Sequence, residues 1–130
     1  MKHLKTIYLI DDDEGINFLN RSVISRLQLA DNVVAFKDPI VAFDTLKKEI
    51  EAGTAPELIL LDINMPLMDG WEFVKKYGSL GQDEASVIIM LSSSIDPADE
   101  AKAESIKQIA GFRSKPLSFD MAEEILRTYF

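Results

Sequence analysis

The sequence lacks cysteine entirely and has a single histidine, His3, among its 130 residues. The lack of cysteine excludes disulfide bonds, thiol chemistry and cysteine-ligated zinc sites. No apolar run approaches the ~18 residues that a membrane-spanning helix needs. The apolar segment near the N-terminus is too short for a signal peptide and ends in acidic residues. We therefore expect a cytoplasmic protein with no membrane attachment.

Glycine-rich phosphate loops are also missing, because neither GxxxxGK[ST] nor GxGxxG occurs in the sequence. A nucleotide bound through such a loop is therefore disfavoured. Positive charge is scarce as well, with 14 Lys and Arg against 22 Asp and Glu, which gives a formal net charge of −8. Such an acidic chain repels phosphate backbones and anionic lipid, so we expect no direct binding to nucleic acid or membranes.

Short apolar runs recur along the chain and predict strands. Two of them, Leu58–Leu61 and Val87–Leu91, are continuously apolar, which is typical of strands covered on both faces of a parallel sheet. The predicted strands are Thr6–Ile10, Asn32–Phe36, Leu58–Leu61, Val87–Leu91 and a weaker one at Gly111–Ser114.

Segments with helical spacing of apolar residues separate these runs. The predicted buried faces are Ile16, Leu19, Val23 and Leu27; Phe43, Leu46 and Ile50; Phe73, Val74, Tyr77 and Leu80; and Phe119, Ala122, Leu126 and Tyr129. The segment Ala98–Ala110 has a poorer face. Helix starts are predicted at capping residues, namely Asp38, Asp69 with Glu72, Asp96 and Ser118. Alternating strands and helices predict one α/β domain over residues 1–130, a doubly wound parallel sheet.

Polar residues that could bind a ligand or react follow four of the predicted strands. In open α/β sheets, ligands bind at the carboxyl ends of the strands, where the strand order switches. The residues at these ends are Asp11, Asp12 and Asp13, then Asp62, Ser92 and Lys115. Clustered carboxylates without His or Cys favour Mg²⁺. One carboxylate could then act as a nucleophile, with the lysine and the hydroxyl contacting a transferred phosphoryl group.

Four segments in order, "LIDDDEG", "LLDINMPLMDG", "MLSSS" and "SKP", resemble the receiver domain of two-component response regulators. The resemblance covers essentially the whole chain. It implies a flavodoxin-like (βα)5 fold with five parallel strands in the order 2-1-3-4-5 and helices on both faces. We expect one receiver domain over residues 1–130, which is stand-alone if the chain is complete and otherwise part of a longer regulator or hybrid kinase.

The resemblance implies a role for each matching residue. Asp62 is expected to be the phosphoacceptor. Asp11 and Asp12 are expected to bind Mg²⁺, with Asp12 the more direct ligand, together with Asp62 and the backbone carbonyl of Asn64.

Three further residues match the family's switch and phosphate-binding positions. Ser92 is expected to be the switch hydroxyl and Phe112 the switch aromatic. Lys115 is expected to contact the phosphoryl group, and its bond to Pro116 is expected to be cis. Asp13 is expected to cap the first helix, and Phe112 could instead be an ordinary core residue.

The family's mechanism implies the partners. A sensor histidine kinase or a histidine phosphotransfer protein would donate the phosphoryl group. The face formed by the fourth helix, fifth strand and fifth helix would then change shape and contact an unknown downstream protein. We expect this chain to be a monomer or a phosphorylation-dependent dimer. The chain would not be an enzyme beyond Mg²⁺-dependent self-phosphorylation and slow autodephosphorylation.

Three other functions are compatible with part of the sequence. The first is a phosphate-independent interaction module with a receiver-like fold. The second is a magnesium phosphatase of the haloacid-dehalogenase class, which needs a second aspartate where this chain has Asn64. The third is a flavin or nucleotide binder, disfavoured by the acidic strand ends and the missing phosphate loop.

Overall fold

A computed structural model describes residues 2–130. Strands and helices alternate along the chain as β1 (Leu4–Ile10), α1 (Glu14–Arg26), β2 (Ala30–Phe36), α2 (Pro39–Glu51), β3 (Leu58–Asp62), α3 (Gly70–Ser79), β4 (Val87–Ser92), α4 (Pro97–Glu104), β5 (Ile109–Ser114) and α5 (Phe119–Tyr129). All of the predicted strands are confirmed, and each is extended by one to two residues at one end. In the described part of the chain, no helix is both long enough and apolar enough to cross a membrane.

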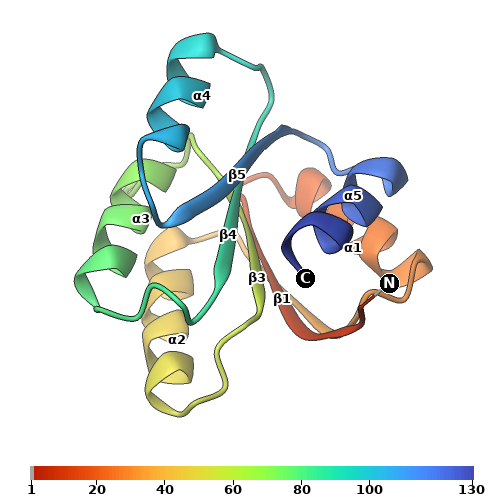
Figure 1. Cartoon of the computed structure of the whole chain (residues 1–130), viewed down its shortest axis with the longest axis horizontal. Coiled ribbons are helices and arrows are strands. Elements are labelled where there is room, and N and C mark those ends of the chain that lie inside the picture. The colour runs from red at the N-terminus through yellow and green to blue at the C-terminus, as the bar shows by residue number, and fades with distance from the viewer. Residues whose placement is uncertain (1) are drawn as a thin grey trace.

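The strands form one five-stranded sheet in the order β2-β1-β3-β4-β5, and every neighbouring pair is parallel. Helices α2, α3 and α4 cover one face of the sheet, and α1 and α5 cover the other (Figure 1). This arrangement confirms the flavodoxin-like fold. The chain passes from β1 to β2 on one side and from β3 to β4 on the other side, so the strand order reverses between β1 and β3.

The central strand β3 shows why the apolar runs are continuous. All five of its residues are buried. Because side chains alternate along a strand, Ile59 and Leu61 join the core on the α2–α3 face, and Leu58 and Leu60 join the core on the α1–α5 face. A strand with a core on each side has no position for a polar residue until it ends.

Each helix begins at the capping residue expected from the sequence. Asp38, Asp96 and Ser118 accept hydrogen bonds from backbone N–H groups of the first turns of α2, α4 and α5. Asp69 and Glu72 form a reciprocal capping box at α3. Asp13 caps α1 by accepting from the N–H groups of Gly15 and Ile16. These caps fix the helix starts directly after the carboxyl ends of the strands.

The buried face of α1 differs from the prediction. The structure buries Asn17, Asn20 and Ile24, whereas the predicted face residue Leu19 is 47% exposed. Apolar spacing failed here because both asparagines make hydrogen bonds to backbone groups of neighbouring loops, which allows their amides to be buried. The same kind of error affects α5, where Phe119 is 43% exposed.

The predicted helical segment Ala98–Ala110 is also wrong in length. Helix α4 ends at Glu104, and Ile109 and Ala110 already belong to β5. Ile109 pairs with Ile88 of β4. This large apolar residue, which was predicted to lie on the helix, is therefore part of the sheet. Ala103 is the single buried residue within α4.

Candidate functional site

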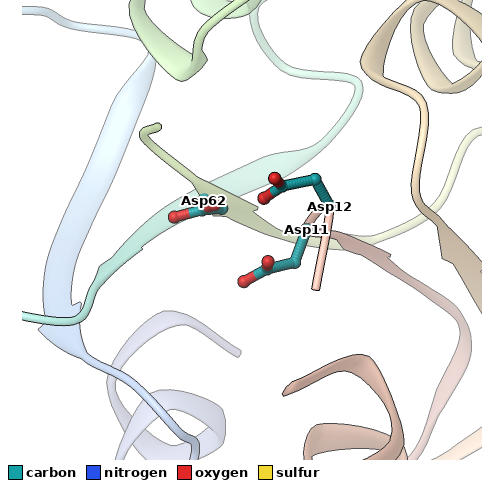
Figure 2. A group of neighbouring side chains, drawn as sticks. All are labelled: Asp11, Asp12 and Asp62. Carbon is teal, nitrogen blue, oxygen red and sulfur yellow. The ribbon is translucent and has the colours of Figure 1, made fainter. Parts of the chain in front are cut away.

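Three aspartates gather at the carboxyl end of the sheet (Figure 2). Strands β1 and β3 are neighbours, with Ile10 beside Leu61, so Asp11 and Asp62 leave adjacent strands at the same level. Asp12 follows in the loop before α1. The cluster therefore lies at the reversal of strand order, where open α/β sheets bind ligands.

The aspartates differ in burial. Asp11 and Asp62 are each 4% exposed, and Asp12 is exposed. One carboxylate oxygen from each of the three lies within 4.8 Å of the others. Oxygens that share one Mg²⁺ at ~2.1 Å lie at most about 4.2 Å apart. Small side-chain rotations would therefore let all three contact a single ion, and an all-oxygen donor set suits Mg²⁺.

Lys115 joins the two buried carboxylates from the end of β5. Its Nζ donates to Asp11 Oδ2 at 3.0 Å and to Asp62 Oδ1 at 3.1 Å, and its side chain is 12% exposed. Burial opposes the protonation of Lys115, but the hydrogen bonds to Asp11 and Asp62 outweigh it and raise the pKa above its ordinary value. Lys115 is therefore a cation. Its backbone N–H donates to the Ser92 carbonyl at 2.9 Å, and the Lys115–Pro116 bond is cis, as expected.

Asp62 is held in an unfavourable environment for a carboxylate. Burial and the nearby charge of Asp11 raise its pKa to about 6, although the hydrogen bond from Lys115 acts in the opposite direction. One lysine thus leaves the negative charge of three carboxylates incompletely compensated. This imbalance fits a site that takes a divalent cation.

The Ser92 hydroxyl has a hydrogen-bond partner outside the carboxylate cluster, and the Phe112 ring is a core residue. Ser92 is buried, and its hydroxyl donates to the Ser94 carbonyl at 2.6 Å. Phe112 is buried in the core on the α2–α3 face, the same core that contains Ile59 and Leu61. Asn64 is exposed, two residues after Asp62. The structure therefore brings together Asp11, Asp12, Asp62 and Lys115, and it places Ser92 at the neighbouring strand end.

Sequence reasoning missed the role of Gly70. Its N–H donates to the Ile63 carbonyl at 2.7 Å, and a Cβ at this position would lie 2.6 Å from the backbone oxygen of Asp62. The start of α3 therefore packs directly against the backbone that carries Asp62. The capping residue Asp69 directly before Gly70 predicts a helix start at this point, but it does not indicate the contact with the Asp62 backbone.

Comparison with known proteins identifies the family. The family model described as "Response regulator receiver domain" matches residues 7–127. The chain belongs to this family. Receiver domains act in two-component systems, where they interact with histidine kinases and downstream effectors.

Solved receiver structures share the whole fold. A two component response regulator from Cytophaga hutchinsonii is 31% identical with a TM-score of 0.91, and the match covers 97% of this chain and 96% of that one. A response regulator receiver protein from Dyadobacter fermentans is 26% identical with a TM-score of 0.83, covering 95% of each chain.

Two curated relatives have similar sequence identity, and one of them is much longer. A protein-glutamate methylesterase/protein-glutamine glutaminase from Ralstonia nicotianae is 30% identical over 111 residues, which cover 85% of this receiver domain but 27% of that protein. A probable methanogenesis regulatory protein, FilR2, from Methanothrix harundinacea is 27% identical, covering 94% of this chain and 77% of that one. The receiver domain therefore spans about a quarter of the length of the methylesterase.

Proposed function

We propose that residues 1–130 form one receiver domain in which Asp62 accepts a phosphoryl group from a histidine kinase or a histidine phosphotransfer protein. The observation that carries the proposal is the convergence on Asp62. Its buried carboxylate contacts Lys115 and lies within 4.8 Å of oxygens from Asp11 and Asp12. A carboxylate in this setting has a nucleophilic oxygen and a cation ready for the incoming charge.

Mg²⁺ fits the donor set described above. Asp11, Asp12, Asp62 and the backbone carbonyl of Asn64 would hold it. When bound, the ion would neutralise charge on the phosphoryl oxygens as they approach the carboxylates. Lys115 would also contact the phosphoryl group, since its ammonium already donates a hydrogen bond to Asp62.

The transfer step conserves atoms and charge in a simple way. An oxygen of Asp62 attacks the phosphorus in line with the phosphorus–nitrogen bond of a phosphohistidine. The new bond joins that oxygen to phosphorus, and the electron pair of the broken bond stays on the imidazole nitrogen. Lys115 then donates to a phosphoryl oxygen. The product is an aspartyl phosphate, and no other substrate is converted.

The switch step uses Ser92 and Phe112. In the unphosphorylated state the Ser92 hydroxyl is engaged with the Ser94 carbonyl, and it would turn to donate to a phosphoryl oxygen. Phe112, on the neighbouring strand β5, would move into the vacated space. The α4–β5–α5 face would change with it and bind the downstream protein, since α4 is weakly anchored through Ala103.

Exposed apolar side chains support a protein as the phosphoryl donor. Phe18, Leu19 and Phe119 are 69%, 47% and 43% exposed. They line a hollow of about 370 Å³ together with Pro116 and Leu117, the residues that follow Lys115. Exposed apolar groups beside the acceptor site suit contact with a partner's helix.

Intact mass spectrometry after incubation with Mg²⁺ and acetyl phosphate tests the proposal. We expect one added phosphoryl group, lost in Asp62→Asn and in the presence of a chelator. If the chain gains no mass under conditions that label another receiver domain, the phosphoacceptor role is wrong, and a phosphate-independent interaction module is the better explanation.

A further inference from the structure

Helix α1 buries two asparagines, which is unusual for a helix face that packs on a sheet. Asn17 is 5% exposed and Asn20 is 2% exposed, whereas the apolar Phe18 between them is 69% exposed. Residues three apart lie on the same side of a helix. Burial of an amide is unfavourable unless its hydrogen bonds are made, so these bonds show what the two residues do.

Asn17 holds the backbone of the acidic pair. Its Nδ2 donates to the Asp11 carbonyl at 2.9 Å and to the Phe36 carbonyl at 3.3 Å. The Asp11 carbonyl belongs to the planar peptide unit that leads into Asp12. Among the residues that the structure describes, the Asp12 carboxylate has no hydrogen-bond donor of its own, so its position depends on this backbone.

The other end of the Asn17 amide shows that stability alone does not explain the residue. Its Oδ1 is buried and has no hydrogen-bond partner within residues 2–130. An unpaired buried acceptor destabilises the folded chain. The donor group is therefore the useful part of the side chain, and it is directed at the Asp11 carbonyl.

Asn20 holds the backbone of the lysine loop. Its Oδ1 accepts from the Leu117 N–H at 2.8 Å. On the other side of Pro116, the Lys115 N–H donates to the Ser92 carbonyl at 2.9 Å. The loop that presents the Lys115 ammonium is thus fixed at two points, one on β4 and one on α1.

We infer that Asn17 and Asn20 are positioning residues, through which one turn of α1 sets the spacing between the acidic pair and Lys115. The inference rests on the proposed function of Asp62. It separates two effects: Asn17 governs the metal-binding carboxylates, and Asn20 governs the lysine that meets the phosphoryl group.

The experiment compares Asn17→Ser, Asn20→Ser and a matched control, Ile24→Ala, in the full chain. Ile24 lies on the same buried side of α1, 1% exposed, and packs only in the apolar core. Calorimetric titration measures the Mg²⁺ dissociation constant, and intact mass measures the labelling rate by acetyl phosphate at saturating Mg²⁺. Urea unfolding confirms that each variant is folded.

We expect Asn17→Ser to weaken Mg²⁺ binding about tenfold. We expect Asn20→Ser to change the Mg²⁺ dissociation constant less than about twofold and to lower the saturated labelling rate about tenfold. Ile24→Ala should lower stability and leave both quantities near the wild-type values. If Ile24→Ala reproduces the losses, or if Asn17→Ser binds Mg²⁺ like the wild type, the inference is overturned. A wild-type chain that binds Mg²⁺ but is never labelled would instead refute the proposed function, and the Mg²⁺ titration would still decide the role of Asn17.

Discussion

The buried carboxylate of Asp62 lowers the stability of the folded, metal-free protein near neutral pH. Its side chain is buried at the end of a fully apolar strand and lies near a second buried carboxylate. Both features favour the protonated form and raise the pKa from its ordinary value of 3.8 to about 6. Near neutral pH the metal-free protein therefore holds a charge that would be more stable in the unfolded chain.

We predict that Asp62→Asn stabilises the metal-free protein near pH 7. A group whose pKa is raised in the folded state contributes stability below its unfolded pKa, and that contribution is lost as the pH rises through the folded value. The gain in unfolding free energy should be on the order of 2 kcal/mol at pH 7 and should shrink as the pH falls from 6 towards 4. Urea unfolding in chelator across this pH range measures it. Parallel stability curves for the two proteins would contradict the prediction.

Leu67 is a second residue in an unfavourable state. It lies in the loop after Asp62 with φ of +72°, and its side chain is 80% exposed. The left-handed conformation costs most L-residues about 1–2 kcal/mol, and asparagine tolerates it better. We predict that Leu67→Asn raises the free energy of unfolding by about 1 kcal/mol, whereas Leu67→Ala brings no such gain. Equal values for the two variants in urea unfolding would refute the strain explanation.

At the scale of elements, α4 has the weakest anchoring of the helices. It buries Ala103 alone, while α3 buries Phe73, Val74 and Tyr77. Elements with few buried apolar contacts open at low free energy. We predict that the amides of α4 exchange with deuterium faster than those of α3 in the unphosphorylated protein. Hydrogen exchange with mass or NMR detection measures this, and equal protection of the two helices would show that α4 is not the mobile element.

The sequence predicted elements well where apolar residues alone decide the structure. Strands such as Leu58–Asp62 are buried on both sides, and caps such as Asp69 act within four residues, so both leave a local signal. The predicted buried face of α1 was wrong because the actual face contains Asn17 and Asn20, whose hydrogen-bond partners are backbone groups elsewhere in the chain. Leu117 is 97 residues from Asn20, and no periodicity reveals such a bond.

The candidate site was predictable for a related reason. Parallel strands end at one edge, so Asp11, Asp62 and Lys115 could be brought together from the strand assignments alone. The second layer of contacts, including the approach of Gly70 to the Asp62 backbone, depends on loop conformations that local patterns do not fix.

At the scale of the whole molecule, the fold concentrates negative charge at the carboxyl end of the sheet. The formal net charge is −8, and three carboxylates converge where the strand order reverses. A ligand that binds only the folded arrangement stabilises the whole chain by mass action. Divalent cations should therefore act as global stabilisers of this protein.

We predict that Mg²⁺ at a hundredfold excess over its dissociation constant raises the free energy of unfolding by about 2.7 kcal/mol. Asp12→Asn should lose most of this gain because it removes a carboxylate from the cluster. Asp13→Asn is the matched control, since Asn is an equally good helix cap and Asp13 lies outside the cluster. Thermal unfolding with and without Mg²⁺ measures the difference, and a similar gain in both variants would place the ion elsewhere.

The chain has one tryptophan, Trp71 in the first turn of α3, and the Lys102 ammonium of α4 lies 4.4 Å from the centre of its ring. The emission spectrum of an indole depends on the position of a positive charge beside its ring. A shift of α4 would move the charge and change the light emitted. The molecule therefore contains an optical reporter, and any shift of α4 against α3 can be timed in a stopped-flow fluorimeter without attaching a dye.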